Sequence, residues 1–596
     1  MLPIGPTHRR VQCRERRYDG GNFFSRSGNL PGTLSKSFCL KTAITHGVEL
    51  PWKSAEAWCR KGRTYGERGQ YDRAIECYDR AINLDANATT AWYHKGLALT
   101  TAGRYREAAE CFDQTIRLDP TSARSWYSRG QVLYNLQKYQ EAAEYCGQAV
   151  KLAPDSASAW LTRGHAFKNM GRIPDAIACY DRVVTIEPGR IEAWFARGTA
   201  LATERRYDRA IDCYDRVIAL DPENAGAWYA RGTMQILLAR YGDALASFDR
   251  AVTIDPNHAD TWYTRGCTLA ALQRYDEAVG CFDRAIALRP DDADAWYNRG
   301  RALQHLEHYE EALVCYDRAL RIRPEHTGIW YQKGMALKRL RRYDLAIACF
   351  DRALRENTAD PEIWYQKGFL LFTQKRYEEA IECFDLALRI RADHTDACYY
   401  RGESYYALRN YEAATACYQA VVRMTPENAV AWNNYGNALY RLERYEEALV
   451  CYERALGIDP ENQRVWSNKA NVLSILTHYD KALVCYDQEL RAHPEDADAW
   501  HNKGLALFIL GRYGEALACY TQALEADPAR AEVWSMKGNA LVILERSGEA
   551  LDCYDRALAT NPDDADALKG KAVALVYLDR STEAVRCYER LRRVPR

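Results

Sequence analysis

The sequence predicts an all-α solenoid built from sixteen helix–turn–helix repeats. Three observations support this prediction: one pattern recurs every 34 residues, each copy holds two apolar stripes with helical spacing, and a proline closes most copies. A fixed period of this length is typical of stacked units that share one continuous core. The 596-residue chain is therefore not expected to divide into several separate globules.

The repeat is clearest in residues 429–462, where Trp432 begins the pattern. A tryptophan occupies this position in every repeat except two, in which Cys398 and Leu568 replace it, and no residue is inserted or lost between copies. The tryptophans are Trp58, Trp92, Trp126, Trp160, Trp194, Trp228, Trp262, Trp296, Trp330, Trp364, Trp432, Trp466, Trp500 and Trp534.

The pattern W-x2-L-G-x2-Y, followed by A-x3-F and P, resembles the tetratricopeptide repeat family. The resemblance covers residues 55–596, with repeats that start at 55, 89, 123 and so on to 565. It implies a right-handed α–α superhelix in which the first helix of each repeat lines a concave groove.

Each repeat contains two expected helices. Trp432, Gly436 and Leu439 follow the spacing of a buried helical stripe, and Ala448 and Tyr452 belong to a second such stripe. Glycine occupies the Gly436 position in fourteen repeats, and alanine occupies the Ala448 position in all sixteen. We expect the two helices to approach most closely at these small residues.

The turns between repeats carry their own signals. Pro460, with eleven equivalents, closes the second helix because proline cannot continue one. Asn462, Asn224, Asp292 and Asp496 share the next N-cap position and are expected to cap the following helix.

Two departures from the pattern are informative. The closing proline is missing at residues 356–358 and 391–393, and Cys398 follows in place of tryptophan. The tenth and eleventh repeats are therefore predicted to form the loosest junction. Arg592 stands where earlier repeats have an aliphatic residue, which predicts a terminal cap.

Residues 1–54 do not match the repeat and are predicted to be a basic, mostly disordered leader. They hold nine Lys or Arg and three acidic residues, a net charge of +6, whereas the whole chain balances 81 against 81. Their apolar surface is too small to offset the entropy of ordering. The Arg and Ser content of this segment is also typical of a transit peptide, which is an alternative interpretation. Trp52 is a candidate cap on the first repeat.

Cysteine spacing argues against a disulfide scaffold. Fourteen of the 20 cysteines occupy one repeat position, which we call the cysteine series: Cys77, Cys111, Cys179, Cys213, Cys281, Cys315, Cys349, Cys383, Cys417, Cys451, Cys485, Cys519, Cys553 and Cys587. Equivalent positions in adjacent repeats lie about 8–10 Å apart, beyond the reach of a disulfide. We expect reduced, buried thiols and no zinc site.

The sequence favours a protein–protein interaction scaffold that binds extended peptide segments in the concave groove. No partnered catalytic residues or phosphate-binding loop occur, so we expect no enzyme activity, metal or cofactor. The alternatives are a regulatory subunit of a separate enzyme chain and an RNA-binding helical-repeat protein. Acidic residues along one groove edge argue against nucleic acid.

No apolar run is long enough to span a membrane, and no signal-peptide core is present. We expect a cytoplasmic protein, monomeric or weakly self-associating, with a protein or peptide ligand.

The resemblance places a series of tyrosines on the inner wall of the groove, and tyrosine offers large contact area with a polar tip. They are Tyr93, Tyr127, Tyr229, Tyr263, Tyr297, Tyr331, Tyr365 and Tyr399. They either bind ligand or only support neighbouring repeats. Arg301, His305, Lys338 and Arg339 gather on adjacent repeats as a candidate site for a carboxylate.

An asparagine series is the sharpest candidate site. Its members stand two or five residues after the tryptophan of repeats 12–15: Asn434, Asn437, Asn468, Asn471, Asn502 and Asn539. A side-chain amide both donates and accepts, so it can pair with a peptide backbone without reading its sequence. Beside it stand apolar candidates for the peptide's side chains: Ile475, Phe508, Ile509, Val542, Ile543, Val576 and Tyr577. The alternative is that these asparagines only solvate the helix. The series resembles the groove of the O-linked N-acetylglucosamine transferases.

Overall fold

The computed structural model describes residues 54–592, which form 32 α-helices joined by short turns. Within this range there is no strand, which confirms the all-α fold of sixteen helix pairs. The chain divides into two compact units at Pro222–Glu223, and each is described by itself. The expected leader up to residue 53, with Trp52, lies outside the described residues.

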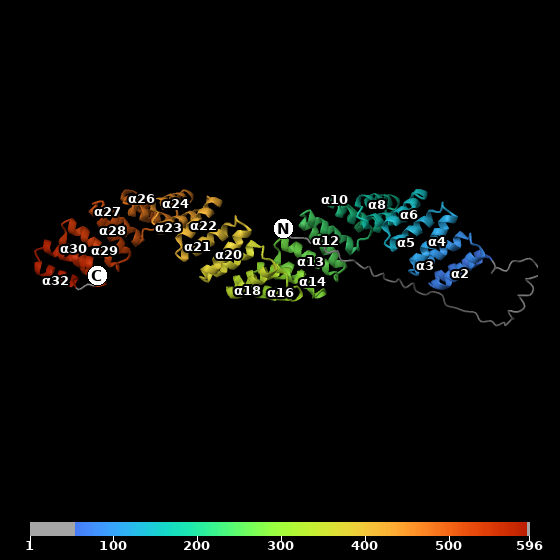
Figure 1. Ribbon diagram of the computed structural model, residues 1–596, viewed down its shortest axis with the longest axis horizontal. Helices are drawn as coiled ribbons and strands as arrows, with labels where there is room; N and C mark the ends of the chain where they lie inside the picture. The colour runs from blue at the N-terminus through green and yellow to red at the C-terminus, as the bar shows by residue number, and fades with distance from the viewer. Residues whose placement is uncertain (1–53, 593–596) are drawn as a thin grey trace, which may run out of the picture. The chain divides into compact units, whose positions relative to one another are not determined.

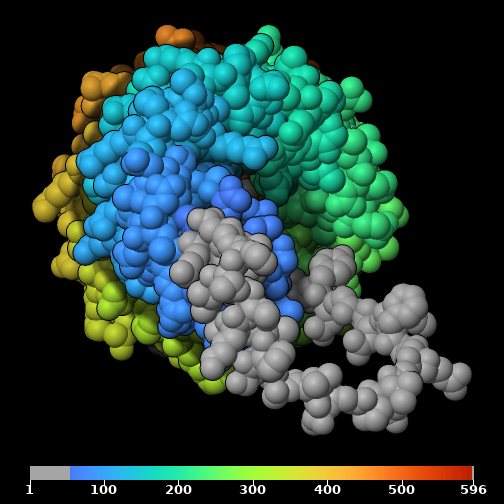
Figure 2. All heavy atoms as spheres, turned by 90° about the vertical axis from the view of Figure 1, so that its right-hand side faces the viewer, coloured from blue at the N-terminus to red at the C-terminus, as the bar shows by residue number. Residues whose placement is uncertain are grey.

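The first unit contains repeats 1–5. Figure 2, where these repeats are coloured blue to teal, shows their side chains packed into one continuous surface. Its helices are α1 (Ala55–Glu67), α2 (Tyr71–Leu84), α3 (Thr89–Thr101), α4 (Tyr105–Leu118), α5 (Ala123–Asn135), α6 (Tyr139–Leu152), α7 (Ala157–Asn169), α8 (Ile173–Ile186), α9 (Ile191–Thr203) and α10 (Tyr207–Leu220).

The second unit contains repeats 6–16, in which odd-numbered first helices alternate with even-numbered second helices (Figure 1). The helices of repeats 6–10 are α11 (Ala225–Leu237), α12 (Tyr241–Ile254), α13 (Ala259–Ala271), α14 (Tyr275–Leu288), α15 (Ala293–His305), α16 (Tyr309–Ile322), α17 (Thr327–Arg339), α18 (Tyr343–Glu356), α19 (Pro361–Thr373) and α20 (Tyr377–Ile390). Those of repeats 11–16 are α21 (Thr395–Ala407), α22 (Tyr411–Met424), α23 (Ala429–Arg441), α24 (Tyr445–Ile458), α25 (Gln463–Ile475), α26 (Tyr479–Ala492), α27 (Ala497–Ile509), α28 (Tyr513–Ala526), α29 (Ala531–Ile543), α30 (Ser547–Thr560), α31 (Ala565–Tyr577) and α32 (Ser581–Leu591).

Small residues mark the closest approach of the two helices in a repeat, as expected. A Cβ atom added to Gly436 would stand 2.6 Å from the ring of Tyr452, so only glycine fits without a shift. Ala448 and its fifteen equivalents are all buried. A larger side chain at either position would overpack the core.

The tryptophans fasten each repeat to the turn before it. The indole N–H of Trp432 donates to the carbonyl oxygen of Pro426 at 2.9 Å, across the boundary between repeats 11 and 12. Trp364 makes the same bond to the carbonyl of Thr358 at 3.0 Å, although proline is missing there. The turn at Thr358 thus keeps its hydrogen bond without proline. The turn at residues 391–393 has no such bond, because Cys398 stands in place of the tryptophan that follows it.

Helix caps follow the expectation at three of the four named positions. The side chains of Asn224, Asp292 and Asp496 accept backbone N–H groups of the following helix. The prediction for Asn462 is wrong, because its amide N–H group donates to Asp459 Oδ2 at 3.0 Å and its side chain makes no cap hydrogen bond.

The members of the cysteine series within the described residues are free thiols, all buried except the half-buried Cys587. Beside them runs a row of ion pairs between the second helix of one repeat and the first helix of the next. Arg299, for example, contacts Asp283 Oδ1 at 2.6 Å and donates to Cys315 Sγ at 3.0 Å. Partly exposed pairs of this kind contribute little stability singly, and here they repeat along the array.

Candidate peptide-binding groove

The tyrosines expected on the groove wall are half-buried, and Tyr93, Tyr263 and Tyr399 are hydrogen-bonded to the next repeat. The hydroxyl group of Tyr93 lies 3.4 Å from Ser128 Oγ in the next repeat. The Tyr297 ring contacts His326, and the Tyr331 ring is tilted against Phe350 of its own repeat. Burial raises the pKa of Tyr331 to about 12 and also raises the pKa of Tyr127. These contacts favour a supporting role between repeats.

The asparagine series forms hydrogen bonds along repeats 11–13 of the second unit. The Asn434 amide donates to the Tyr399 hydroxyl at 2.9 Å and to Glu403 Oε1 at 2.7 Å. The Asn468 amide likewise donates to Asn437 Oδ1 at 2.9 Å. Two amides predicted to face a ligand are therefore already engaged with the preceding repeat.

The asparagines five residues after the tryptophan share a second partner. Each accepts a hydrogen bond from the buried tyrosine of its own second helix, and these pairs are Asn437–Tyr452 at 2.9 Å, Asn471–Tyr486 at 3.2 Å and Asn539–Tyr554 at 2.7 Å. The carbonyl oxygen is thus occupied, and the amide N–H group of Asn471 remains as a donor. Among the described residues, no hydrogen bond engages the Asn502 amide.

A pocket of about 320 Å³ opens between α25 and α27. Asn471 and Asn502 line it together with Ile475 and Ile509. The isoleucines belong to a row of exposed side chains that stand nine residues after the tryptophan position in four successive repeats. We call it the aliphatic row after its three isoleucines, and its members are Ile475 (45% exposed), Ile509 (51%), Ile543 (46%) and Tyr577 (70%). Phe508, by contrast, is half-buried and packs against Tyr513.

The four basic residues expected to act together have separate partners. Arg301 lies over the ring of Tyr297, and His305 stacks on Tyr275 of the previous repeat at 4.5 Å. Burial and Arg301 lower the pKa of His305. Lys338 Nζ instead donates to Gln366 Oε1 of the following repeat at 2.7 Å. Only Arg339 on α17 is exposed without such a contact among the described residues.

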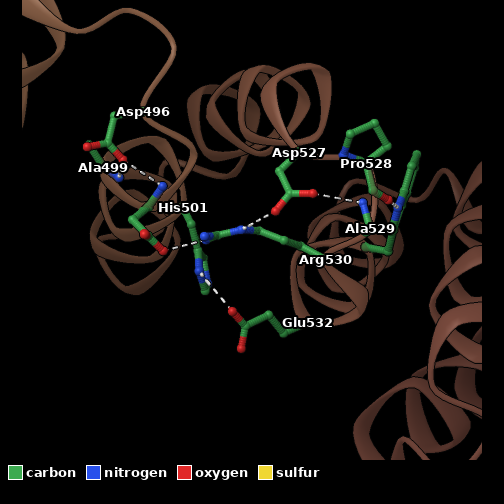
Figure 3. A network of polar contacts seen from close by, with 10 residues as sticks. Asp496, Ala499, His501, Asp527, Pro528, Ala529, Arg530 and Glu532 are labelled. Atoms are coloured by element: carbon green, nitrogen blue, oxygen red, sulfur yellow. Dashed lines mark hydrogen bonds and ion pairs between the residues drawn. The ribbon is translucent and has the colours of Figure 1, made fainter.

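The acidic groove edge is largely paired with cations of the same repeat or of the preceding one. Figure 3 shows Arg530 directed toward Asp527 and His501 directed toward Glu532. Arg530 also contacts Asp498 Oδ1 at 2.5 Å, and this bond lowers the pKa of Asp498. The edge is therefore less negative than its sequence suggests, which weakens the charge argument against nucleic acid.

Comparison with known protein families shows which family the chain belongs to. A tetratricopeptide repeat model matches residues 96–157, 195–259, 263–327, 331–395, 399–463 and 535–595. Two further tetratricopeptide repeat models match residues 55–87 and 497–529, and residues 133–197. The chain belongs to the tetratricopeptide repeat (TPR) family.

Several solved structures are similar to parts or most of this TPR chain. YrrB, described as a TPR protein with an unusual peptide-binding site, is 24% identical over 32% of this chain and 96% of its own, with a TM-score of 0.28. MamA is 25% identical over 28% and 96%, with a TM-score of 0.27. The Naa15/Naa10 complex bound to HypK-THB is 15% identical over 91% and 94%, with a TM-score of 0.32. No curated protein sequence matches the chain.

TPR arrays are in general scaffolds for protein–protein interaction and typically lack catalytic activity. No described helix is both long and apolar enough to cross a membrane. In residues 54–592 there is also no group of three or more His, Cys, Asp or Glu residues placed to hold a metal ion.

Two features of the TPR array could not be predicted from a single repeat. Phe369, Phe372 and Tyr400 form an aromatic cluster in repeats 10–11, with Phe369 and Tyr400 edge to face at 5.0 Å. Lys338 Nζ lies 4.4 Å from the centre of the Phe369 ring. Glu489 is also buried, at a position where the adjacent repeats have alanine. Comparing each repeat position across all sixteen copies would have revealed both.

Proposed function

We propose that this TPR chain is a scaffold that binds an extended peptide segment of a partner protein in the groove of repeats 12–16. The observation that carries the proposal is the pocket in which Asn471 and Asn502 lie beside Ile475 and Ile509. Backbone-binding amides and exposed aliphatic side chains thus share one surface, as peptide-binding grooves require.

The amides supply contacts to the peptide backbone. An extended peptide presents N–H and C=O groups that need partners when it leaves water. Asn502 can both donate and accept, whereas Asn471 can donate because Tyr486 occupies its oxygen. Each such bond contributes about 0.5–1.5 kcal/mol to binding, which favours peptides without fixing their sequence.

The aliphatic row supplies binding affinity and a preference for peptides with aliphatic side chains. Single exposed apolar residues are ordinary, but four at one position of successive repeats form a continuous strip that a partner can cover. Because these isoleucines are already about half buried, covering the rest of one contributes roughly half of the 1.5–3 kcal/mol that a fully exposed side chain gains on burial. We expect the bound peptide to carry aliphatic side chains spaced to reach Ile509 and Ile543.

Selection from a random peptide display library with the full-length chain tests the proposal. The affinity of the selected peptides is then measured for the wild type and for the double variant Ile509→Asp with Ile543→Asp. We expect the double variant to weaken binding by more than about tenfold, because 1.4 kcal/mol corresponds to a factor of ten.

The second helices provide a matched control. Val450 and Val484 are each 56% exposed on α24 and α26, and their change to Asp introduces the same charge at the same spacing of one repeat. This control should bind the selected peptides as the wild type does. An equal loss of affinity in both variants, or no loss in the groove variant, would contradict the proposed site.

A further inference from the structure

Repeat 11 places two thiols side by side in its core. Cys398 lies on α21 and Cys417 on α22, and both side chains are buried. Cys398 Sγ donates to the backbone carbonyl oxygen of Cys417 at 3.4 Å, which places the Cys398 thiol against Cys417. The pair therefore bridges the two helices of one repeat.

This juxtaposition arises from a single departure from the repeat. Cys417 belongs to the cysteine series, but its counterparts face a tryptophan, or Leu568 in the last repeat, at the position of Cys398. Neither side chain can react with a thiol. Cys451 and Cys485, the next two members of the series, face Trp432 and Trp466 and serve as internal controls.

Arg401 contacts Cys417 as Arg299 contacts Cys315, so the neighbouring Cys398 is what sets Cys417 apart within the cysteine series. Arg401 Nε donates to Cys417 Sγ at 3.3 Å, while Asp385 holds its Nη1 at 2.6 Å. The neighbouring Cys398 thiol and the Arg401 guanidinium together lower the pKa of Cys417 against the opposing effect of burial. A lowered pKa favours the thiolate, which is the nucleophilic form.

We propose that Cys398 and Cys417 are a redox modification site, at which hydrogen peroxide converts the two thiols into a disulfide. The Cys417 thiolate attacks one peroxide oxygen, the O–O bond breaks, and the departing hydroxide takes a proton to leave as water. Cys398 sulfur then attacks the Cys417 sulfenic acid, the S–O bond breaks, and the Cys398 proton leaves with hydroxide as a second water. Two thiols and one peroxide thus yield one disulfide and two waters.

The site lies next to the asparagine series. The helix that carries Cys398 also carries Tyr399 and Glu403, which accept the amide hydrogens of Asn434. Disulfide formation would tie α21 to α22 at the point where this helix meets repeat 12. The modification is independent of peptide binding and can be tested without a partner.

Mass spectrometry of the full-length chain tests the proposal. The folded protein is treated with hydrogen peroxide, the remaining thiols are alkylated, and the digest is analysed with and without dithiothreitol. We expect the peptides that carry Cys398 and Cys417 to be joined, lighter by two hydrogen atoms than their sum, and separated by the reductant. Both should lose free thiol at least about tenfold faster than Cys451 and Cys485.

Two variants separate disulfide formation from general oxidation. Cys398→Trp restores the residue common to the other repeats, and Cys398→Ser keeps the small size if the tryptophan does not fit. In both, circular dichroism should remain that of the wild type and no joined peptide should form. Retention of both thiols in the wild type, or oxidation of Cys417 no faster than Cys451 and without a cross-link, would overturn the proposal.

Discussion

Glu489 is a carboxyl group buried at a position where adjacent repeats use alanine. It is 6% exposed, it is hydrogen-bonded to Ser467, and its Oε2 has no partner among the described residues. Burial raises its pKa from 4.5 to about 7, and Asp496 and Asp498 add to this shift against the opposing effects of Ser467 and His493. The folded chain therefore holds a proton that the unfolded chain releases.

The stability of this region should consequently fall as the pH rises from about 4.5 to 7. In that window the unfolded state loses the proton first, so ionisation favours unfolding by up to about 3 kcal/mol. Glu489→Gln should remove this pH dependence and stabilise the chain at pH 8. Urea unfolding at pH 5 and pH 8 measures the effect. An identical pH dependence in the variant and the wild type would exclude the buried, protonated state.

Asn539 is expected to matter for stability as well as for binding. Its side-chain oxygen accepts from the fully buried Tyr554 hydroxyl, so Asn539→Ala should destabilise the chain by about 1–3 kcal/mol through the unpaired group. Asn502→Ala, which breaks no hydrogen bond among the described residues, should change stability by less than about 0.5 kcal/mol. Thermal unfolding compares the two, and Tyr554→Phe should rescue most of the loss in the Asn539 variant.

The sequence predicts the positions of these asparagines but not their hydrogen bonds. Spacing places Asn434 and Asn437 on one helix face. Whether their amides face solvent or the next repeat depends on how far adjacent helices are displaced, which no single repeat encodes. For the same reason the sequence alone does not show that Cys398 lies against Cys417, although Cys398 visibly departs from the tryptophan pattern.

At the scale of the elements, the turn between the two helices of a repeat is a recurrent source of strain. Each repeat has one residue there with positive φ, glycine in four repeats and another residue in twelve. Arg341, with φ of 58°, is exposed, whereas Gly511, with φ of 75°, is already suited to this conformation. A left-handed conformation costs a residue with a Cβ atom about 1–2 kcal/mol.

Replacing a residue by glycine at one turn and glycine by alanine at the other should therefore change the stability of the chain in opposite directions. Arg341→Gly should stabilise the chain by up to about 1 kcal/mol, while Gly511→Ala should destabilise it by a similar amount. No neighbouring atom lies within 4 Å of a Cβ at Gly511, so backbone strain alone is tested. Denaturant midpoints measure both variants, and a shift of the same sign in the two would contradict this view of the turn.

The helices themselves could be predicted almost completely from the sequence. Gly436 and Ala448 identify the closest contact, and periodic aromatic residues fill the space around it. The loss of the cap at Asn462, whose amide turns to Asp459, could not be predicted, because Asn224 caps its helix with Asp221 at the same spacing. The residue type at each repeat position does not show which of several nearby partners a side chain will bind.

At the scale of the whole molecule, stability should be distributed along the array, because each repeat contacts mainly its neighbours. Ala448→Leu should overpack the fully buried site in repeat 12 at a cost of about 1–3 kcal/mol. Hydrogen exchange should then accelerate in residues 429–462 and the adjoining repeats. Repeats 6 and 7 of the same unit should keep their protection, and a uniform loss across the unit would show that it unfolds as a single cooperative block.

The proposed function depends most on where a bound peptide lies, and site-directed photo-cross-linking measures this directly. A benzophenone side chain is placed at Ile543 in the aliphatic row or at Val450 on the second helix of repeat 12, and a peptide selected by display is added before irradiation. We expect a cross-link from position 543 that excess unlabelled peptide abolishes, and none from position 450. A specific cross-link from position 450 alone would contradict the proposed function.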